Sequence, residues 1–223
     1  MLDGARSSCS MRYSRYWGAN MRVIIFGATG KTGRHAVRRA LDDGHETTAF
    51  GRSVERLDAE DRLTLARGDV FDAEVVADAV DGHDAVIVCL GSANLKDRTT
   101  LTSGTQNIVD AVDRHGVERL VVVSAAGVGD SWAQNPVSSK LMFKTMLRNV
   151  FADHQSQEEA VRRSNTNWTI VRPAVLSDKL ERRSVTASNS SPTKRIHRAA
   201  LAGFLVDQLD DSTYIWQAIT VTS

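Results

Sequence analysis

Three glycines stand at a fixed spacing in the segment Gly27-Ala28-Thr29-Gly30-Lys31-Thr32-Gly33, directly after a short apolar run. In a strand-to-helix turn, the first glycine permits a tight bend, the second lets the backbone approach a pyrophosphate, and the third allows close packing of the helix. The N–H groups at the helix start and the positive end of its dipole then face the phosphates. Thr29 and Thr32 add hydroxyl groups, and Lys31 adds a positive charge. The segment predicts a dinucleotide-binding turn. It is too short between its first two glycines for a triphosphate-binding loop.

The residues after the second apolar run bear on the type of dinucleotide. An NAD site carries Asp or Glu at this point, which binds the ribose 2′-hydroxyl. This chain instead has Arg52 and Ser53, followed by Arg56. A carboxylate would repel a 2′-phosphate, whereas a guanidinium binds one through paired hydrogen bonds. We therefore expect NADP(H) to be preferred over NAD(H); the alternative is that these arginines are solvated surface charges.

Residues after the third and fourth apolar runs complete the expected nucleotide site. Asp69 can accept a hydrogen bond from the adenine amino group, and Val70 can lie against the ring. After the fourth run, Cys89 and Leu90 are expected to pass beneath the adenosine ribose. Gly91 has no side chain and would let the backbone come close to the sugar.

Three residues are candidates for substrate chemistry. Ser124 ends the fifth apolar run, at the edge where open α/β sheets bind ligands, and its hydroxyl can bond the nicotinamide carboxamide or an acceptor carbonyl. His154 can donate a proton or hold the nicotinamide ribose, since the ordinary pKa of histidine is about 6.5. Trp132 follows the fifth run and is a candidate for stacking on a planar substrate. The structural alternatives are a serine that caps a strand, an exposed histidine beside Asp153, and a tryptophan packed on the next helix.

Other site types find no support in the sequence. The remaining histidines fall on predicted helix faces or turns, where we expect them at the surface: His35, His45, His83, His115 and His197. No two histidines share a helix face at zinc spacing, and Cys9 and Cys89 are isolated, so no metal site is expected. There is no Gly-x-Ser-x-Gly segment of the kind that carries a hydrolase serine.

These candidates need a scaffold that brings several strand ends together. From Met21 onward, apolar runs alternate with amphipathic helical patterns. The predicted strands are 22–26, 47–50, 63–66, 84–90, 120–124, 168–171 and 214–221, and the predicted helices are 31–43, 75–80, 101–115, 138–150, 153–163 and 199–209. This alternation implies right-handed crossovers and a parallel sheet. We expect an α/β fold: residues 21–223 form one doubly wound Rossmann-type domain with a mainly parallel sheet. The substrate-side elements are expected at about 127–150 and in a small C-terminal extension, 174–223.

Composition narrows the class of protein. The chain has 223 residues, of which 42% are hydrophobic and 25% are charged, and Lys plus Arg number 28 against 27 Asp plus Glu. A net charge of +1 argues against nucleic-acid binding, and no apolar run approaches the roughly 20 residues of a membrane span. Two cysteines make no disulfide framework, so a cytoplasmic setting is expected. Residues 1–20 are expected to be a disordered leader or to precede the true start at Met21, with a transit-like segment as the alternative.

Taken together, these residues make the chain resemble the atypical short-chain dehydrogenase/reductase family, and within it the biliverdin-IXβ reductase/flavin reductase-like NAD(P)H-binding proteins. The matching segments are 26–33, 52–56, 68–70, 84–91, 107–109, 115–117, 124–125 and 153–154. The resemblance implies NADP binding and hydride transfer to a small, often planar acceptor. It places Ser124 and His154 near the nicotinamide, with Pro173 and Ala174 completing the coenzyme site.

Two departures from the family pattern limit what the resemblance implies. The Tyr-x-x-x-Lys pair of standard members is absent, and the matching place reads Val-Phe-Ala-Asp-His at 150–154. The reductase relatives also lack this pair, but they carry a second histidine where this chain has Ala174. Chemistry that depends on that histidine is not carried over.

The sequence therefore favours an NADPH-dependent reductase of a small conjugated or carbonyl acceptor such as a flavin, a quinone or a tetrapyrrole. Such acceptors can take their proton from solvent, so the protein needs mainly to position the reactants. We expect a monomer or homodimer that acts on a small molecule, with no nucleic-acid or membrane partner. One alternative is a non-catalytic NADP-binding redox sensor or scaffold. Another is an enzyme like the nucleotide-sugar epimerases and dehydratases, which the missing tyrosine disfavours.

Overall fold

The computed structural model describes residues 20–92, 99–129, 148–179, 184–188 and 195–223. The helices are α1 (Lys31–Asp42), α2 (Ala73–Val80), α3 (Thr100–His115), α5 (Arg148–Arg163) and α6 (Arg198–Asp207), with a 3-10 turn, η1 (Val54–Arg56). The strands are β1 (Arg22–Phe26), β2 (Glu46–Gly51), β3 (Leu63–Arg67), β4 (Ala85–Val88), β5 (Arg119–Val123), β6 (Asn167–Pro173), β7 (Val175–Ser177), β8 (Thr186–Ala187), β9 (Arg195–His197) and β10 (Gln217–Thr222).

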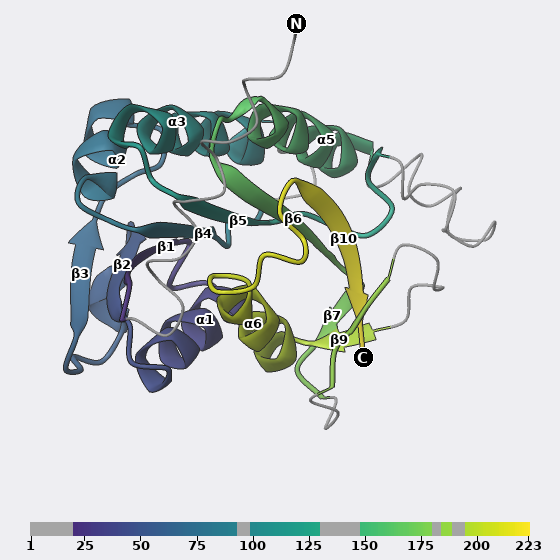
Figure 1. The fold of residues 1–223 in the computed structure, drawn as a ribbon, viewed down its shortest axis with the longest axis horizontal. Helices are drawn as coiled ribbons and strands as arrows, with labels where there is room; N and C mark the ends of the chain where they lie inside the picture. Colours follow the sequence, from purple (N-terminus) through teal and green to yellow (C-terminus); the bar gives the residue numbers. More distant parts are fainter. Residues whose placement is uncertain (1–19, 93–98, 130–147, 180–183, 189–194) are drawn as a thin grey trace, which may run out of the picture.

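Within these residues, eight strands form one sheet in the order β3-β2-β1-β4-β5-β6-β10-β8 (Figure 1). All neighbours in the sheet are parallel except β8, which runs antiparallel to β10. Strands β7 and β9 form a separate parallel pair. The chain order reverses between β1 and β4, which is the point where open α/β sheets bind ligands. The predicted α/β fold with a mainly parallel sheet is confirmed.

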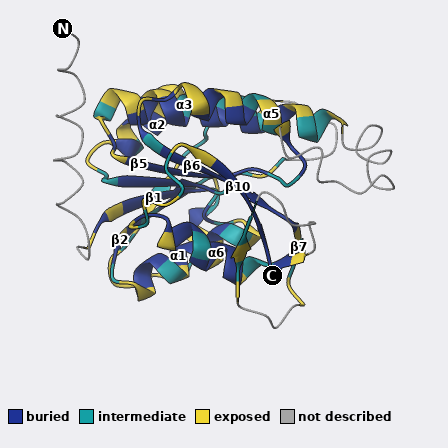
Figure 2. Cartoon of the chain, turned by 45° about the vertical axis from the view of Figure 1, so that its right-hand side comes forward, coloured by how far each residue is buried: buried dark blue, intermediate teal, exposed yellow. Residues whose placement is uncertain are grey.

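Helices cover both faces of the sheet. Helices α1 and α6 pack against each other on one face, and α2, α3 and α5 lie on the other (Figure 1). Successive residues of a strand point to opposite faces, so Ile25 lies in the core half beside α1 and α6 while Ile24 lies in the other half. Figure 2 shows the buried residues along the sheet and on the helix faces that pack on it. Burial on both faces explains why residues 23–26 of β1 are all apolar.

The predicted elements differ from the structure mainly in the second half of the chain. The short strands β7, β8 and β9 were not predicted, because two or three residues carry no usable period. The last strand begins at Gln217 rather than at residue 214, and Trp216 before it has a φ of 57°. The predicted helix 138–150 lies largely outside the described residues. Among the described residues, no helix is both long and apolar enough to cross a bilayer.

The prediction that the histidines other than His154 lie at the surface is wrong for His45. Its side chain is only 5% exposed, and its Nδ1 accepts a hydrogen bond from the backbone N–H of Met21 at 3.3 Å. His83 is also partly buried, with Nε2 2.8 Å from Thr48 Oγ1, and burial lowers the pKa of its imidazole. Both residues lie just before strands at the amino edge of the sheet, His45 before β2 and His83 before β4.

Candidate functional site

The turn between β1 and α1 passes directly against the end of β4. Gly27 has a φ of 74°, and a Cβ at this position would lie 2.6 Å from the carbonyl oxygen of Cys89. A Cβ on Gly33 would lie 2.2 Å from the carbonyl oxygen of Gly27. Both obstructing atoms belong to the backbone, so no side chain fits at either position. The expected tight bend and close helix approach are therefore present in the structure.

Among the described residues, no side chain caps the first turn of α1. Its N-cap residue, Gly30, offers no side-chain acceptor, and the first turn contains no acidic residue. Because the first N–H groups of a helix have no partner within the helix, they are available to an anion. Thr29 and Thr32 are partly buried beside this turn, while Lys31 is exposed and places its Nζ 3.7 Å from Asp178 Oδ2. The geometry suits a diphosphate.

Two exposed guanidinium groups stand just after β2. Arg52 follows the last residue of the strand, and Arg56 lies in η1, with the partly buried Ser53 between them. Within the described part of the chain, neither arginine forms an ion pair or a hydrogen bond through its side chain. The second strand thus ends in unneutralised positive charge where an acidic residue would suit an unphosphorylated ribose.

The turn after β3 is fixed by α3. The side-chain amide of Asn107 donates a hydrogen bond to the carbonyl oxygen of Val70 at 2.8 Å, and a Cβ on Gly104 would lie 2.8 Å from Val70 Cγ2. Asp69 Oδ1 accepts a hydrogen bond from the N–H of Phe71 at 3.2 Å. Val70 therefore lies against the helix, and the carboxylate of Asp69 keeps one oxygen for another donor.

The residues after β4 lie next to the glycine turn. The N–H of Cys89 donates to the carbonyl oxygen of Phe26 at 2.9 Å, and burial raises the pKa of the Cys89 thiol to about 12. Leu90 packs against Gly104 of α3. Gly91 is exposed, and a Cβ there would meet nothing within 4 Å, so the protein itself does not require glycine at this position.

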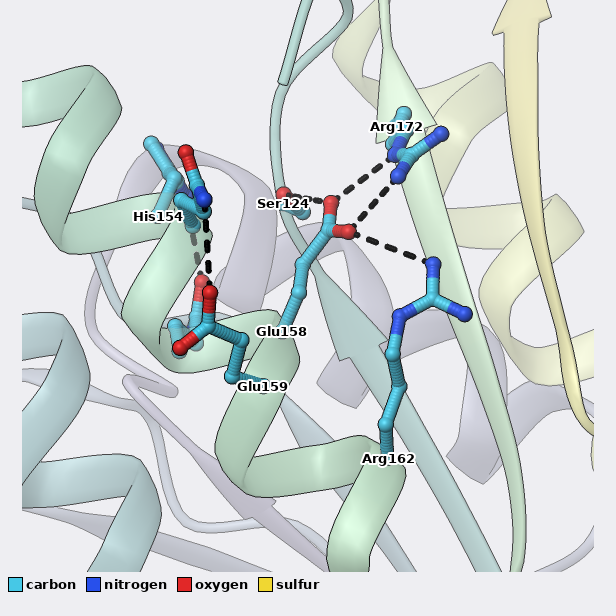
Figure 3. A network of polar contacts seen from close by, with 8 residues as sticks. Ser124, His154, Glu158, Glu159, Arg162 and Arg172 are labelled. Carbon is cyan, nitrogen blue, oxygen red and sulfur yellow. Dashed lines mark hydrogen bonds and ion pairs between the residues drawn. The ribbon is translucent and has the colours of Figure 1, made fainter. Parts of the chain in front are cut away.

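Ser124 takes part in a buried polar network (Figure 3). Its hydroxyl donates to Glu158 Oε1 at 2.7 Å, and Arg172 donates to the same carboxylate through Nε at 2.8 Å and Nη2 at 2.7 Å. Ser124 is 3% exposed and Arg172 is 1% exposed. Arg162 adds a longer contact, with Nη2 3.5 Å from Glu158 Oε2. The network joins the ends of β5 and β6 to α5.

Sequence reasoning missed Glu158 and Arg172. The available signal was an arginine as the single charged residue of the buried strand 167–173, because a charge in a buried strand needs an opposite charge nearby. The sequence does not show which of the many acidic residues supplies it.

We expect Glu158→Met to lower the free energy of unfolding by about 3 to 5 kcal/mol, because it leaves the buried Arg172 guanidinium without its carboxylate. The double variant Glu158→Met/Arg172→Met removes both charges together and should recover most of this loss. Urea unfolding measures both. Glu159→Met, on the exposed side of the same helix, is the control and should change stability little. Equal losses for the double variant and for Glu158→Met would contradict the assigned pairing.

His154 lies on α5, one turn before Glu158. Its Nδ1 is 3.1 Å from Gln157 Oε1, and Gln157 in turn donates through Nε2 to Thr105 Oγ1 at 3.0 Å. This second bond leaves Gln157 Oε1 as an acceptor, so Nδ1 carries the proton and Nε2 keeps its lone pair. Burial lowers the pKa of His154, and the hydrogen bond with Gln157 and the charges of Asp153 and Glu158 only partly oppose this effect.

Asp153 has a structural role of its own at the start of α3. Its carboxylate accepts hydrogen bonds from the N–H of Leu101 at 3.0 Å and from the N–H and hydroxyl of Thr102 at 2.9 and 2.6 Å. A side chain of α5 therefore caps the N-terminus of α3. This bond network fixes the part of α5 that carries His154.

The lowered pKa of His154 predicts a pH dependence of stability. The unfolded chain takes up a proton near the ordinary pKa of about 6.5, while the folded protein does so only at lower pH. The contribution of His154 to stability is therefore complete above about pH 6.5 and is lost as the pH falls toward the folded pKa. His154→Gln should make the loss of thermal stability between about pH 7 and pH 5 smaller. The lowered pKa of His83 contributes equally to the wild type and to His154→Gln, so it does not affect the difference between them. An unchanged pH dependence would contradict burial of a neutral imidazole.

The remaining predicted site residues are divided between the site edge and the core. Pro173 ends β6, and its carbonyl oxygen accepts from the N–H of Ala126 at 3.0 Å. Ala174 is 4% exposed, bonds the carbonyl oxygen of Val221 through its N–H at 2.9 Å, and packs in the core half beside α1 and α6. Trp132 lies outside the described residues.

The sheet brings the predicted residues together in two groups. Gly27, Cys89 and Ser124 directly follow β1, β4 and β5, which are neighbours in the sheet. Arg52 and Asp69 follow β2 and β3, which continue the sheet beyond β1, on the same side of the switch point as β1. This row along the carboxyl edge suits an extended ligand with a diphosphate at its middle. Among the described residues, no cluster of three or more His, Cys, Asp or Glu side chains is placed to hold a metal ion.

The chain is similar to several known proteins in sequence or in fold. The chain is 36% identical to a 3 beta-hydroxysteroid dehydrogenase/Delta 5→4-isomerase of Mycobacterium tuberculosis over 119 residues, which cover 48% of this chain but only 32% of that protein. Its fold is similar to that of a short-chain dehydrogenase/reductase from Veillonella parvula solved in complex with NADP, with a TM-score of 0.76, 23% identity, and 92% and 95% of the two chains covered. It is also similar to an anaerobillin reductase from Escherichia coli O157:H7, with a TM-score of 0.72, 21% identity, and 90% and 96% covered.

The family model described as NAD(P)H-binding matches residues 27–212. This match begins at the first glycine of the turn and runs through α6, so it includes every strand end that carries a predicted site residue. The chain belongs to this NAD(P)H-binding family.

Proposed function

We propose that the protein is an NADPH-dependent reductase that transfers hydride to a small conjugated or carbonyl acceptor, of the flavin, quinone or tetrapyrrole class. The observation that carries the coenzyme preference is the pair of exposed guanidinium groups after β2, which lack partners among the described residues. The E. coli anaerobillin reductase with the same fold supports a planar tetrapyrrole-like acceptor as one member of this class.

The residues of the site divide the work of binding. The N–H groups at the start of α1, together with Thr29 and Thr32, bind the diphosphate. Arg52 and Arg56 bind the 2′-phosphate, and Asp69 accepts a hydrogen bond from the adenine amino group. When bound, NADPH supplies the hydride. The ends of β5 and β6 exclude water from the side of the site that faces the buried Glu158–Arg172 pair.

Two measurements test the proposal. Isothermal titration calorimetry with NADP⁺, NADPH, NAD⁺ and NADH should show binding of the phosphorylated forms at least tenfold tighter than that of the others, the effect of about one charge-assisted hydrogen bond. Steady-state oxidation of NADPH should then occur with FMN, menadione or biliverdin as acceptor. If the protein binds NADP(H) but does not oxidise NADPH with FMN, with menadione or with biliverdin, the reductase proposal is excluded.

A non-catalytic NADP-binding sensor is the second candidate, and one observation favours it. Ala174 is buried in the core where reductase relatives carry a histidine, and Ser124 already donates its hydroxyl to Glu158. Tight NADP(H) binding without turnover, combined with a partner protein that binds only one redox form of the complex, would support this function instead.

A further inference from the structure

The buried carboxylate of Glu158 determines what the hydroxyl of Ser124 can offer to a ligand. A hydroxyl has one proton to donate and two lone pairs that can accept. Both oxygens of Glu158 already accept hydrogen bonds from Arg172, so the carboxylate faces Ser124 as an acceptor, and the hydroxyl proton points to it at 2.7 Å. What remains on Ser124 Oγ is acceptor capacity only.

On the basis of the proposed function, we propose that Glu158 and Arg172 are positioning residues that make Ser124 a hydrogen-bond acceptor for the amide N–H of the nicotinamide carboxamide. A carboxamide presents N–H donors on one side and a carbonyl acceptor on the other. A serine that is free to rotate can bond either side. A serine whose proton is held by Glu158 bonds only the N–H side, which selects one orientation of the amide.

The surroundings hold this arrangement rigidly. The N–H of Ser124 donates to the carbonyl oxygen of Val171 at 2.8 Å, which fixes the backbone at the end of β5. Gly129, in the turn that follows, leaves room for the pair: a Cβ there would lie 3.0 Å from Arg172 Nη2. Glu158 and Arg172 come from α5 and β6, so the acceptor of the Ser124 proton is itself held in place by a buried ion pair. Turning the hydroxyl away would cost its hydrogen bond to a charged carboxylate. A lone pair fixed in this way is pre-organised for its ligand.

The test compares NADP⁺ with its 3-acetylpyridine analogue, in which a methyl group replaces the amide NH₂ and the carbonyl is retained. Calorimetry on the full chain gives both dissociation constants without any turnover. We expect the wild-type protein to bind NADP⁺ about tenfold more tightly than the analogue, the effect of one hydrogen bond of ordinary strength. Ser124→Ala should bind the two within about twofold of each other, because the acceptor is gone.

Further variants separate positioning from structural support. The double variant Glu158→Met/Arg172→Met frees the Ser124 hydroxyl to rotate, so the preference for NADP⁺ should fall to about threefold or less. Glu158→Gln keeps an oxygen facing Ser124 and Arg172 Nε, so it should retain the tenfold preference even if the protein is less stable. Glu159→Gln is the matched control: this neighbouring side chain is exposed and bonds Gln155, and the preference should be that of the wild type.

The outcomes separate this role from the proposed function. If wild type binds both compounds equally, or if Ser124→Ala keeps the tenfold preference, Ser124 is not the acceptor, although coenzyme binding stands. If the folded double variant keeps the preference, Glu158 and Arg172 do not position the hydroxyl. If wild type binds neither compound, the proposed function fails, and the role of Ser124 fails with it.

Discussion

Replacing Arg52 with Asp should weaken the binding of NADP⁺ by roughly 30- to 100-fold while leaving the binding of NAD⁺ unchanged or improved. The variant removes the guanidinium that stands where an acidic residue would bind an unphosphorylated ribose. Hydrogen bonds to a charged group contribute about 1.5 to 3 kcal/mol, and the new carboxylate adds repulsion toward the 2′-phosphate. The same carboxylate can accept from the 2′-hydroxyl of NAD⁺. Calorimetry with the two oxidised coenzymes measures both changes.

The control for this substitution is Arg114→Asp. It makes the same change of charge in the last turn of α3, where Arg114 lies 3.8 Å from Glu74 and outside every segment assigned to the coenzyme. This control should leave both affinities close to those of the wild type. An equal fall in affinity for NADP⁺ and NAD⁺ in Arg52→Asp would mean that Arg52 does not distinguish the two, and the preference would then have to arise elsewhere.

Replacing Gly33 with Ala should abolish measurable coenzyme binding and lower the free energy of unfolding by about 2 to 3 kcal/mol. In an ordinary helix this substitution stabilises by about 1 kcal/mol, so the expected sign is the opposite of that set by helix propensity. The reason is the carbonyl oxygen of Gly27, only 2.2 Å from the new Cβ. Overpacking against backbone is relieved only by moving the helix or the turn, and either movement displaces the N–H groups from the diphosphate.

Gly91→Ala is the stability control for this experiment, because a Cβ at that position meets nothing within 4 Å. It should unfold at the same urea concentration as the wild type. Its coenzyme affinity reports separately on whether the backbone passes close to the ribose. A Gly33→Ala protein that retains both its stability and its affinity would show that α1 can shift without disturbing the turn.

The first half of the fold and the glycine turn were predictable because their signals are local. The run at 22–26, the glycines after it and the buried stripe of α1 lie within a few residues of one another, and each sets the backbone where it stands. The position of Arg52 was predictable for the same reason, because it directly follows the second apolar run. The structure adds what local patterns lack, which is the contact of Gly27 with Cys89 across the switch point.

The chemistry around Ser124 was not predictable because it depends on which residues meet across the fold. Ser124, Glu158 and Arg172 come from two strands and a helix, and sequence spacing alone does not pair them. His154 was expected either as an exposed residue or near the nicotinamide, yet its pKa is lowered by burial and its Nδ1 faces Gln157. The enclosure of His45 has the same origin, since the backbone of Met21 folds over a residue in a polar stretch.

The pairing of β1 with β4 also has a consequence for how the protein is made. Val23 lies opposite Ala85 in the sheet. The ribosome therefore completes β1 and the glycine turn well before it synthesises β4, the strand against which the turn packs. Pairings between such distant segments close slowly, because loop entropy is lost before contacts form. A coenzyme that contacts both the glycine turn and the residues after β4 binds the closed sheet in preference to the open chain, so its binding free energy adds to the stability of the folded protein.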